Sequence, residues 1–465
     1  MNNKLNLIAK KAEQDKRIKF NALMHHFSAE NLLGCHRELK RNKACGIDGV
    51  TMEEYEQNLQ GNIELLVNDL KSKSYRPKPV RRVYIPKPGK GEKRGLGIPA
   101  LEDKIVQLML KKILESIFEN DFLDCSFGFR PKLSCHAAID CIDKTIMLKP
   151  INYVVEVDIR KFFDSINHEW LHKCIEERVS DPNVLWLIHR LLKAGYIEEG
   201  KYYSSTLGTP QGGVVSPLLA NIYLHYVLDL WFEKKFKPKC YGYVKLVRYC
   251  DDFIVCCANG KDAENFLIEL KARLSKFSLE VAQDKTNTIA FGRRAWTLWR
   301  QQGKTKPGTF TFLGFTHYCN KTRHGKFTVG RKTSKQSLRR AIADIHGWLK
   351  KTRSWLPLKE WWKTLRLKLN GHYQYFGVSG NMRWLRQFRD KVVQAAYKWI
   401  NRRSQKRSMY RKGFQQYLEK YPLPMPKIYH SLNTLSLSGK CFIEEPCVGK
   451  LQARFCGGRH SNATI

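Results

Sequence analysis

Hydrophobic and polar positions divide the chain into three stretches with different periods. Residues 1–70 follow a helical pattern, whereas residues 75–300 alternate short β-branched runs with helical segments. From residue 301 to about residue 430, apolar and aromatic residues again recur at helical spacing. This order predicts a mixed α+β unit between two helical regions.

Two basic helices are predicted in the third stretch, each with one apolar face. The first face consists of Leu338, Ile342, Ile345 and Leu349, flanked by Arg339, Arg340, Lys350 and Lys351. The second helix runs from Arg383 to Arg403, and its apolar face consists of Trp384, Phe388, Val392, Ala395 and Trp399. Positions three or four residues apart lie on one side of a helix, which supports both assignments.

The charge is strongly positive and is concentrated in the same stretch. The 82 Lys and Arg residues exceed the 43 Asp and Glu residues, and the formal net charge is +39. Residues 301–430 contain 30 basic residues and only four acidic ones. A solvated helix surface explains any single basic run, but it does not explain the missing acids. The balance favours a polyanionic partner, and nucleic acid is the leading candidate.

The remaining composition favours a folded cytoplasmic protein. Hydrophobic residues make up 43% of the 465 residues, enough for two or three compact units. The 14 cysteines include no CxxC pair, which indicates free thiols in a reducing compartment. The first residues lack the pattern of a secretory signal, and polar residues interrupt the most apolar window at 214–232. We therefore expect a cytoplasmic location and no membrane partner.

Three aspartates stand where folding alone does not call for them. Asp158 ends the β-branched run 153–159, and Asp251 and Asp252 form a tight turn between two apolar strands at 245–257. An Asp-Asp pair at a turn is ordinarily explained by turn chemistry. Adjacent like charges near apolar strands are nevertheless costly to desolvate unless a cation neutralises them. Carboxylates on neighbouring strands suit a two-metal site for nucleotidyl transfer, with Mg²⁺ as the expected ion.

Further blocks follow in a fixed order along the chain. They are YIPKP at 84–88, RGLGIP at 94–99, FGFRP at 127–131, FFDSINH at 162–168, GTPQGGVVSP at 208–217 and FLGF at 312–315. Together with Asp158 and the YCDD turn at 249–252, they resemble the bacterial group II intron-encoded reverse transcriptases, or maturases, over about residues 40–430. Cys250 stands where many members have Ala, Met, Ile or Val. The resemblance implies a right-hand polymerase of the α+β class, with fingers and palm built on antiparallel sheet, followed by an α-helical thumb and maturase domain.

The resemblance also implies a domain division. It consists of an N-terminal extension (1–75), fingers and palm (76–300), thumb (301–350), maturase or X domain (351–430) and a tail of unknown role (431–465). Many relatives carry a C-terminal HNH endonuclease, and we expect none here, because only residues 431–465 follow the maturase block. A metal site from Cys441, Cys447, Cys456 and His460 is disfavoured, since their spacing matches no zinc motif. Relatives form dimers, so a homodimer stays open, although no heptad signal is evident.

The metal-binding and catalytic roles are implied by the family motif. Asp158, Asp251 and Asp252 match the metal-binding triad, and the backbone carbonyl of Ile159 would be a further ligand. Two Mg²⁺ ions are expected, with Mn²⁺ as a substitute. Lys285 matches a lysine that protonates the leaving pyrophosphate, and a surface lysine in a loop is the ordinary alternative.

Substrate-binding residues follow from the same resemblance. Lys87 and Arg94 match residues that grip the triphosphate of the incoming nucleotide, with solvated loop cations as the alternative. Gln211 matches a residue beside the nascent base pair. Phe163 matches the side chain that stacks under the deoxyribose and excludes a 2′-hydroxyl. Strict strand alternation would instead put Phe162 on the face of Asp158, so this assignment requires the strand to end first.

The predicted activity is RNA-directed DNA polymerisation together with splicing and mobility of an intron. The implied partners are group II intron RNA, an RNA template with a DNA primer, deoxynucleoside triphosphates and target DNA. The predicted nucleic-acid contacts are Arg130, Arg339, Arg340, Arg402 and Arg403. Two alternatives are a host-adopted reverse transcriptase in DNA repair or defence, and a non-catalytic RNA-binding splicing cofactor. The three aspartates argue against the second, because a disused pocket gains nothing from repelling charges.

Overall fold

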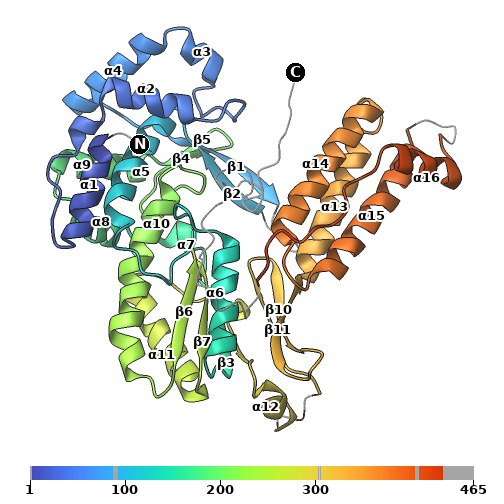
Figure 1. The fold of residues 1–465 in the computed structure, drawn as a ribbon. Helices are drawn as coiled ribbons and strands as arrows, with labels where there is room; N and C mark the ends of the chain where they lie inside the picture. Colours follow the sequence, from blue (N-terminus) through green and yellow to red (C-terminus); the bar gives the residue numbers. More distant parts are fainter. Residues whose placement is uncertain (1–2, 87–92, 302, 304, 404–407, 433–465) are drawn as a thin grey trace.

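The computed structural model describes residues 3–86, 93–301, 303, 305–403 and 408–432 (Figure 1). It is an α+β structure with two four-stranded sheets and one three-stranded sheet among these residues. The N-terminal helices and the first sheet lie at one end, and a helical bundle from the last third of the chain lies to one side (Figure 1). Predicted fold class and observed architecture agree.

The N-terminal helices are α1 (Asn3–Gln14), α2 (Ala29–Glu38), α3 (Met52–Glu56) and α4 (Leu59–Ser72). Helices α1 and α2 pack directly on the long, mostly buried helix α5 (Leu101–Phe118), whereas α4 packs on α2 and α3 packs on α4. Thr51 caps the N-terminus of α3: its side chain accepts from the backbone N–H of Glu54, and the Glu54 carboxylate accepts from the backbone N–H of Thr51. The helical pattern read from residues 1–70 is confirmed.

The first sheet contains Arg94, one of the two residues predicted to bind the triphosphate of the incoming nucleotide. Its strands are β1 (Val80–Pro86), β2 (Lys93–Ile98), β4 (Tyr196–Glu198) and β5 (Lys201–Tyr203), in the order β2-β1-β4-β5. Strands β1 and β2 form an antiparallel hairpin, and β4 pairs with β1 in parallel. In Figure 1 this hairpin projects toward the helical bundle.

The central sheet is antiparallel and apolar on both faces. Its strands are β3 (Tyr153–Asp158), β6 (Val244–Tyr249), β7 (Asp252–Cys257) and β8 (Asn287–Ala290), in the order β6-β7-β3-β8. Along β3, Val154 contributes to one buried cluster, whereas Val155 and Val157 contribute to another. Strand β3 therefore directs apolar side chains to both faces of the sheet, because both faces are covered.

Helices and short turns connect these strands. They are α6 (Cys135–Leu148), α7 (Phe162–Ser165), α8 (His168–Glu176), α9 (Pro182–Lys193), α10 (Ser216–Leu224), α11 (Gly260–Ser275), α12 (Ala295–Gln301) and the 3-10 turns η1 (Met24–His26), η4 (Lys237–Lys239) and η5 (Gln283–Lys285). Helix α10 continues into two π-helical segments, η2 (His225–Asp229) and η3 (Phe232–Phe236). None of the helices in the described part of the chain combines the length and apolar character of a membrane span.

The last third of the chain forms a small sheet and a helical bundle. Its strands are β9 (Thr309–Phe312), β10 (Phe315–Lys321) and β11 (Phe327–Thr333), followed by α13 (Lys335–Thr352), α14 (Leu358–Phe376), α15 (Met382–Ile400) and α16 (Arg411–Lys420). Leu338, Ile345 and Leu349 are buried on α13, as their spacing predicts. Helix α13 runs past the predicted boundary at 350, and α13 to α15 share one hydrophobic cluster. The segments predicted as thumb and maturase domain thus pack together in one bundle.

A segment after this bundle ties it back to the central part of the molecule. Val378 forms a β-bridge with His430, and the His430 ring stacks on His136 of α6 at 3.6 Å between centroids. The His136 ring also bonds the carbonyl of Tyr375 at 2.8 Å. Burial and the neighbouring His430 lower the pKa of His136 from 6.5 to about 4.

This stack predicts a pH-dependent stability. Because the folded-state pKa of His136 is lowered, its contribution to folding is complete above about pH 6.5 and is lost as the pH falls toward 4. We expect the melting temperature to fall by several degrees more between pH 7.5 and pH 5 for the wild type than for His136→Gln. Differential scanning fluorimetry at matched ionic strength measures this difference, and identical slopes for both proteins would contradict it.

Candidate active site

The three predicted aspartates meet at one end of the central sheet. Asp158 is the last residue of β3 and stands directly opposite Asp252, the first residue of β7. Asp251 occupies the turn that joins β6 to β7. Directly opposed residues on antiparallel strands have Cβ atoms about 5 Å apart, so the two carboxylates are neighbours. The strands and turn thus bring together acids that lie almost a hundred positions apart in sequence.

The turn itself is constrained. Cys250 has a φ of 59°, which is uncommon for a residue with a side chain, and it is buried. Gly128 of the FGFRP block packs under this turn, and a Cβ at that glycine would lie 2.5 Å from the Cys250 backbone nitrogen. Glycine is therefore required there by close approach of two backbones.

Desolvation and mutual repulsion raise the pKa values of two of these carboxylates. Desolvation by the surrounding protein, followed by the charges of Asp251 and Asp158, raises the pKa of Asp252 to about 8. Desolvation and the charge of Asp158 also raise the pKa of Asp251, while Arg94 acts in the opposite direction. Asp252 is nevertheless exposed and Asp251 half-buried, so solvent and a ligand reach both carboxylates. Charges held together in this way favour a cation.

Lys285 lies at the same site. Its ammonium group forms an ion pair with the carboxylate of Asp158, and the lysine side chain is 59% exposed. The charges of Asp158 and Asp252 both favour the protonated lysine, and the pKa of Lys285 is raised despite desolvation, the largest effect, which lowers it. The position of Lys285 in the 3-10 turn after residue 282 therefore brings a proton-carrying group to the aspartates.

The donor set fits Mg²⁺ in its chemistry. Carboxylate oxygens are the ligands that Mg²⁺ prefers, and repulsion between Asp251 and Asp252 leaves them in need of a counterion. The backbone bonds of the neighbouring bridge join Asp158 to Ala282 and residue 160 to residue 280, so they do not use the Ile159 carbonyl. Among the described residues, no three His, Cys, Asp or Glu side chains already have the geometry of a metal site.

Two predicted nucleotide-binding residues contact one another. The Arg94 guanidinium donates to the side-chain oxygen of Gln211 at 2.7 Å. The backbone nitrogen of Gly97 donates to the Gln211 carbonyl at 2.6 Å, and a Cβ on Gly212 would lie 2.4 Å from the Gly97 oxygen. Strand β2 and the GTPQGG loop therefore pack backbone to backbone. Lys87, the other predicted grip residue, lies outside the described residues.

Strand β3 ends before Phe163, which is the condition that the assignment of Phe163 sets. Strand β3 ends at Asp158, and Lys161 has a φ of 44°, so strand alternation stops before the two phenylalanines. Phe163 is 8% exposed in α7, and its carbonyl accepts from the backbone of Thr209 at 2.8 Å. The same segment therefore positions both Phe163 and the loop that carries Gln211.

Two of the predicted nucleic-acid contacts are turned inward. Arg130 forms an ion pair with Glu119 at 2.8 Å and donates to the carbonyls of Leu123 and Ser126. Arg403 donates to the Leu356 carbonyl at 2.9 Å. Arg130 therefore uses its guanidinium inside the protein, and Arg403 points part of its guanidinium inward, where Nη1 is buried without a partner among the described residues, so this arrangement does not support a role for either on the nucleic-acid surface.

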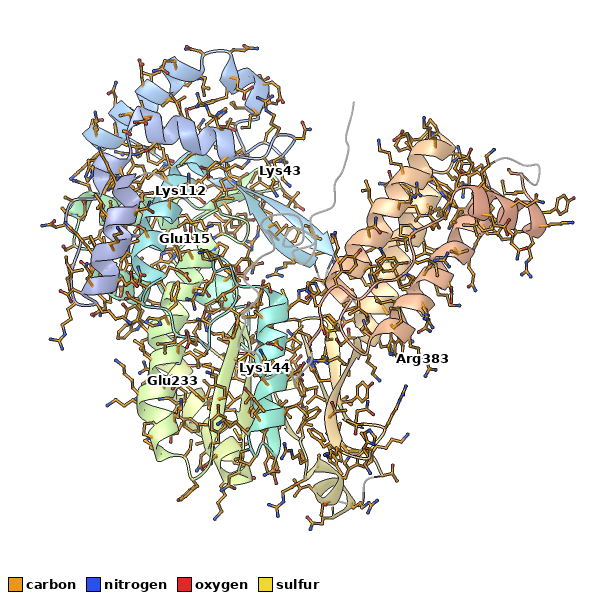
Figure 2. All side chains as sticks on the ribbon, viewed as in Figure 1. Lys43, Lys112, Glu115, Lys144, Glu233 and Arg383 are labelled. Atoms are coloured by element: carbon orange, nitrogen blue, oxygen red, sulfur yellow. The ribbon has the colours of Figure 1, made fainter. Side chains whose placement is uncertain are left out.

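The other three predicted contacts face solvent to differing degrees. Arg339 and Arg402 are exposed, whereas Arg340 is half-buried and lies 3.8 Å from Asp344. Arg402 follows the end of α15 and lies over the Trp399 ring at 5.7 Å. Arg383, at the start of α15, also points away from the bundle (Figure 2). Exposed arginines therefore lie on both α13 and α15.

Sequence reasoning missed one carboxylate beside the site. Glu156 lies two residues before Asp158 on β3, so both side chains share one face. Desolvation raises the pKa of Glu156 to about 7, and a hydrogen bond from the Thr311 backbone works against that rise. Strand alternation along β3 places Glu156 on the same face as Asp158, so the sequence contained the signal, but the prediction considered only the acid at the strand end.

Comparison with known proteins agrees with this geometry. Residues 85–317 match the family described as reverse transcriptase (RNA-dependent DNA polymerase). The chain is 40% identical over 202 residues to the group II intron-encoded protein LtrA of Lactococcus lactis subsp. cremoris, covering 43% of this chain and 33% of LtrA. It is 32% identical over 331 residues to protein YkfC of Escherichia coli K12, covering 66% of this chain and 84% of YkfC. It is also 38% identical over 199 residues to the putative COX1/OXI3 intron 2 protein of Saccharomyces cerevisiae, covering 43% of this chain and 22% of that one.

The chain belongs to the reverse transcriptase family, whose match covers half of its length. Within that class, its relatives include group II intron-encoded proteins and related intron maturases. The alignment spans only a third of LtrA.

Proposed function

We propose that this protein is an RNA-directed DNA polymerase acting by two-metal nucleotidyl transfer. The observation that carries the proposal is the meeting of Asp158, Asp251 and Asp252 at one sheet end, within electrostatic reach of Arg94. An acidic centre beside a cationic group suits a reaction that joins a hydroxyl to a triphosphate. Membership of the reverse transcriptase family supports the same reaction.

The metal would be held by the three aspartates and the Ile159 carbonyl. When bound, two Mg²⁺ ions, or Mn²⁺ in their place, activate the primer hydroxyl and neutralise the phosphate charge. Desolvation, followed by repulsion from the neighbouring carboxylates, raises the pKa values of Asp251 and Asp252, and a bound divalent ion would offset both effects by favouring the charged carboxylates.

The protein's own side chains would orient the nucleotide. Arg94, held by Gln211, binds the triphosphate, and Gln211 limits the space beside the nascent base pair. Phe163 closes the floor under the sugar and excludes a 2′-hydroxyl. Lys285 holds a proton close to Asp158, where it can be given to the leaving pyrophosphate.

Primer extension tests this proposal directly. Purified protein is given a DNA primer on an RNA template, deoxynucleotides and Mg²⁺, and we expect extension products that disappear with EDTA. A protein that binds the template-primer but extends no primer would overturn the polymerase proposal in favour of a non-catalytic splicing cofactor.

We also propose that the helical bundle binds group II intron RNA. LtrA, which is named as a group II intron-encoded protein, and the basic stretch at 301–430 support this partner. The phosphate backbone is recognised mainly by charge, which exposed arginines on α13 and α15 supply.

Two adjacent arginines provide a matched test of that surface. Exposed Arg402→Ala should weaken RNA affinity and lower the slope of log affinity against log salt by about one. Arg403→Ala should instead lower the melting temperature, because this side chain bonds Leu356 and lies over the buried Trp361 ring. Filter binding across a salt series and thermal melting measure both, and an unchanged salt slope for Arg402→Ala would contradict the assignment.

A further inference from the structure

A fully buried arginine, Arg248, lies two residues before the turn that carries the proposed catalytic aspartates. Arg248 lies near the end of β6, and its side chain and that of its partner Asp229 are both 0% exposed. Taking an arginine and an aspartate wholly out of water costs several kcal/mol per ion before their attraction is counted. Well-packed apolar residues in the same place are often equally stable or more so. The pair therefore calls for an explanation other than stability.

Every N–H group of the Arg248 guanidinium has an acceptor. The Asp229 carboxylate takes two bonds, from Nε at 2.8 Å and from Nη2 at 2.5 Å. The Nη1 group donates to the Asn221 side chain at 2.9 Å and to the Cys250 carbonyl at 3.1 Å. The second bond from Nη2 goes to the Ser126 hydroxyl at 2.8 Å. Five donors in a rigid planar fork thus hold four acceptor residues, from three segments of the chain, relative to one another.

The bond to Cys250 reaches the catalytic turn itself. The Cys250 carbonyl belongs to the peptide that joins Cys250 to Asp251, so the guanidinium holds one end of the aspartate's backbone. Cys250 has a φ of 59°, a conformation that persists only when its surroundings enforce it. Arg248 is therefore placed to enforce the turn from the protein interior.

The acceptors of Arg248 are themselves presented by an irregular helix. Asn221 lies on α10 and Asp229 ends the π-helical segment that continues it. In a regular α-helix, two residues eight apart point about 80° away from each other. A π-helical segment turns less per residue, which brings both side chains toward one face. The π-helical distortion thus lets Asn221 and Asp229 both accept hydrogen bonds from the Arg248 guanidinium.

The FGFRP block is fastened to the same residue. The backbone of Arg248 donates to the Cys125 carbonyl at 2.7 Å and accepts from Phe127 at 2.8 Å. Asn221 also donates to the Gly128 carbonyl at 2.6 Å, beneath the turn. The hairpin, the irregular helix and the FGFRP block therefore form one hydrogen-bonded unit around Arg248.

We propose that Arg248 is a positioning residue of the polymerase site: its guanidinium, held by Asp229 and Asn221, fixes the Cys250–Asp251 peptide so that the aspartates face Asp158. The inference rests on the proposed polymerase function for its kinetic consequence. The claim that Arg248 fixes the conformation of the turn rests only on the hydrogen bonds described above and not on the proposed function.

Two variants separate positioning from charge burial. Arg248→Lys keeps the charge near Asp229 but cannot reach four partners at once. The double variant Arg248→Met with Asp229→Leu replaces the ion pair by apolar side chains and leaves no buried charge unpaired. A matched control is the pair Arg178 and Asp121, which is also buried but lies against the N-terminal helix, where Arg178 donates to the Ala12 carbonyl.

The first measurement is single-nucleotide incorporation, normalised to active sites by burst amplitude. We expect kcat to fall about 10- to 100-fold for both Arg248 variants, with the KM for deoxynucleotide within about threefold of wild type, because misplacement of about 1 Å at the reacting centre has that effect. The control with Arg178→Met and Asp121→Leu should keep wild-type kcat whatever its melting temperature.

The second measurement does not depend on activity. Hydrogen–deuterium exchange of the peptide covering 245–257 should accelerate at least tenfold in both Arg248 variants and not in the control. Wild-type exchange in this peptide together with wild-type kcat in the double variant would overturn the proposal. Accelerated exchange in a protein whose wild type extends no primer would support the positioning of the turn and count against the polymerase function alone.

Discussion

Replacing Asp251 by alanine is expected to abolish primer extension while leaving nucleic-acid binding nearly unchanged. The change removes one of three carboxylates that meet at the sheet end, and none of the basic residues proposed to contact phosphates. Under the proposed two-metal mechanism, loss of one of the three carboxylates should reduce incorporation by roughly three orders of magnitude or more. Extension and binding are measured on the same RNA template and DNA primer.

The stability of this variant provides an internal check. Desolvation and the charge of Asp158 raise the pKa of Asp251, so removing its charge relieves repulsion in the metal-free protein. We therefore expect Asp251→Ala to melt no lower than the wild type in EDTA. A suitable control is Glu280→Ala, because Glu280 is a 62% exposed acid that pairs with exposed Arg160. Equal extension by Asp251→Ala and wild type would refute the site.

Much of this site could be predicted because its parts are local. Strand β3, the hairpin of β6 and β7, and the turn between them follow from short apolar runs and two acids. The convergence of Asp158 with Asp252 required only that the two strands pair. Helix α13 likewise followed from its stripe of Leu338, Ile345 and Leu349. Each strand, the turn and helix α13 could be read from its own segment, and only the pairing of β3 with β7 joined two distant ones.

The parts that could not be predicted depend on partners far away in the chain. Arg130 and Arg403 are of the residue type that binds phosphate, yet their guanidinium groups bond carbonyls, and in Arg130 also a carboxylate, from other segments of the chain. Arg248 reads as one polar position in a strand, and only folding brings Asp229 and Asn221 to it. The sequence shows where the arginines are, but only the folded structure shows which acceptor each guanidinium N–H group bonds.

Contacts between distant segments also fix strand β2 against the loop that carries Gln211. Gln211 lies in a loop held by backbone bonds from Gly97 on one side and to Phe163 through Thr209 on the other. The close approach of Gly212 to the Gly97 oxygen leaves no room for a side chain. Strand β2 therefore carries Arg94 to the palm on a fixed backbone, which is why its guanidinium acts on the charge of Asp251.

Replacing Arg94 by alanine is expected to raise the KM for deoxynucleotide by about 10- to 100-fold. A charge-assisted hydrogen bond to phosphate contributes about 1.5–3 kcal/mol, and each 1.4 kcal/mol is a factor of ten. Arg94→Lys should recover part of the loss, since it restores the charge but not the planar fork that also bonds Gln211. Steady-state incorporation across nucleotide concentrations measures both effects.

The neighbouring lysine provides the matched control for charge. Lys93 lies next to Arg94 on β2 and is exposed, and strand alternation points it to the opposite face. Lys93→Ala should therefore change template-primer affinity without changing the KM for nucleotide beyond about threefold. If both alanine variants raised the KM equally, loss of positive potential would account for the effect, and the specific grip of Arg94 on the triphosphate would be excluded.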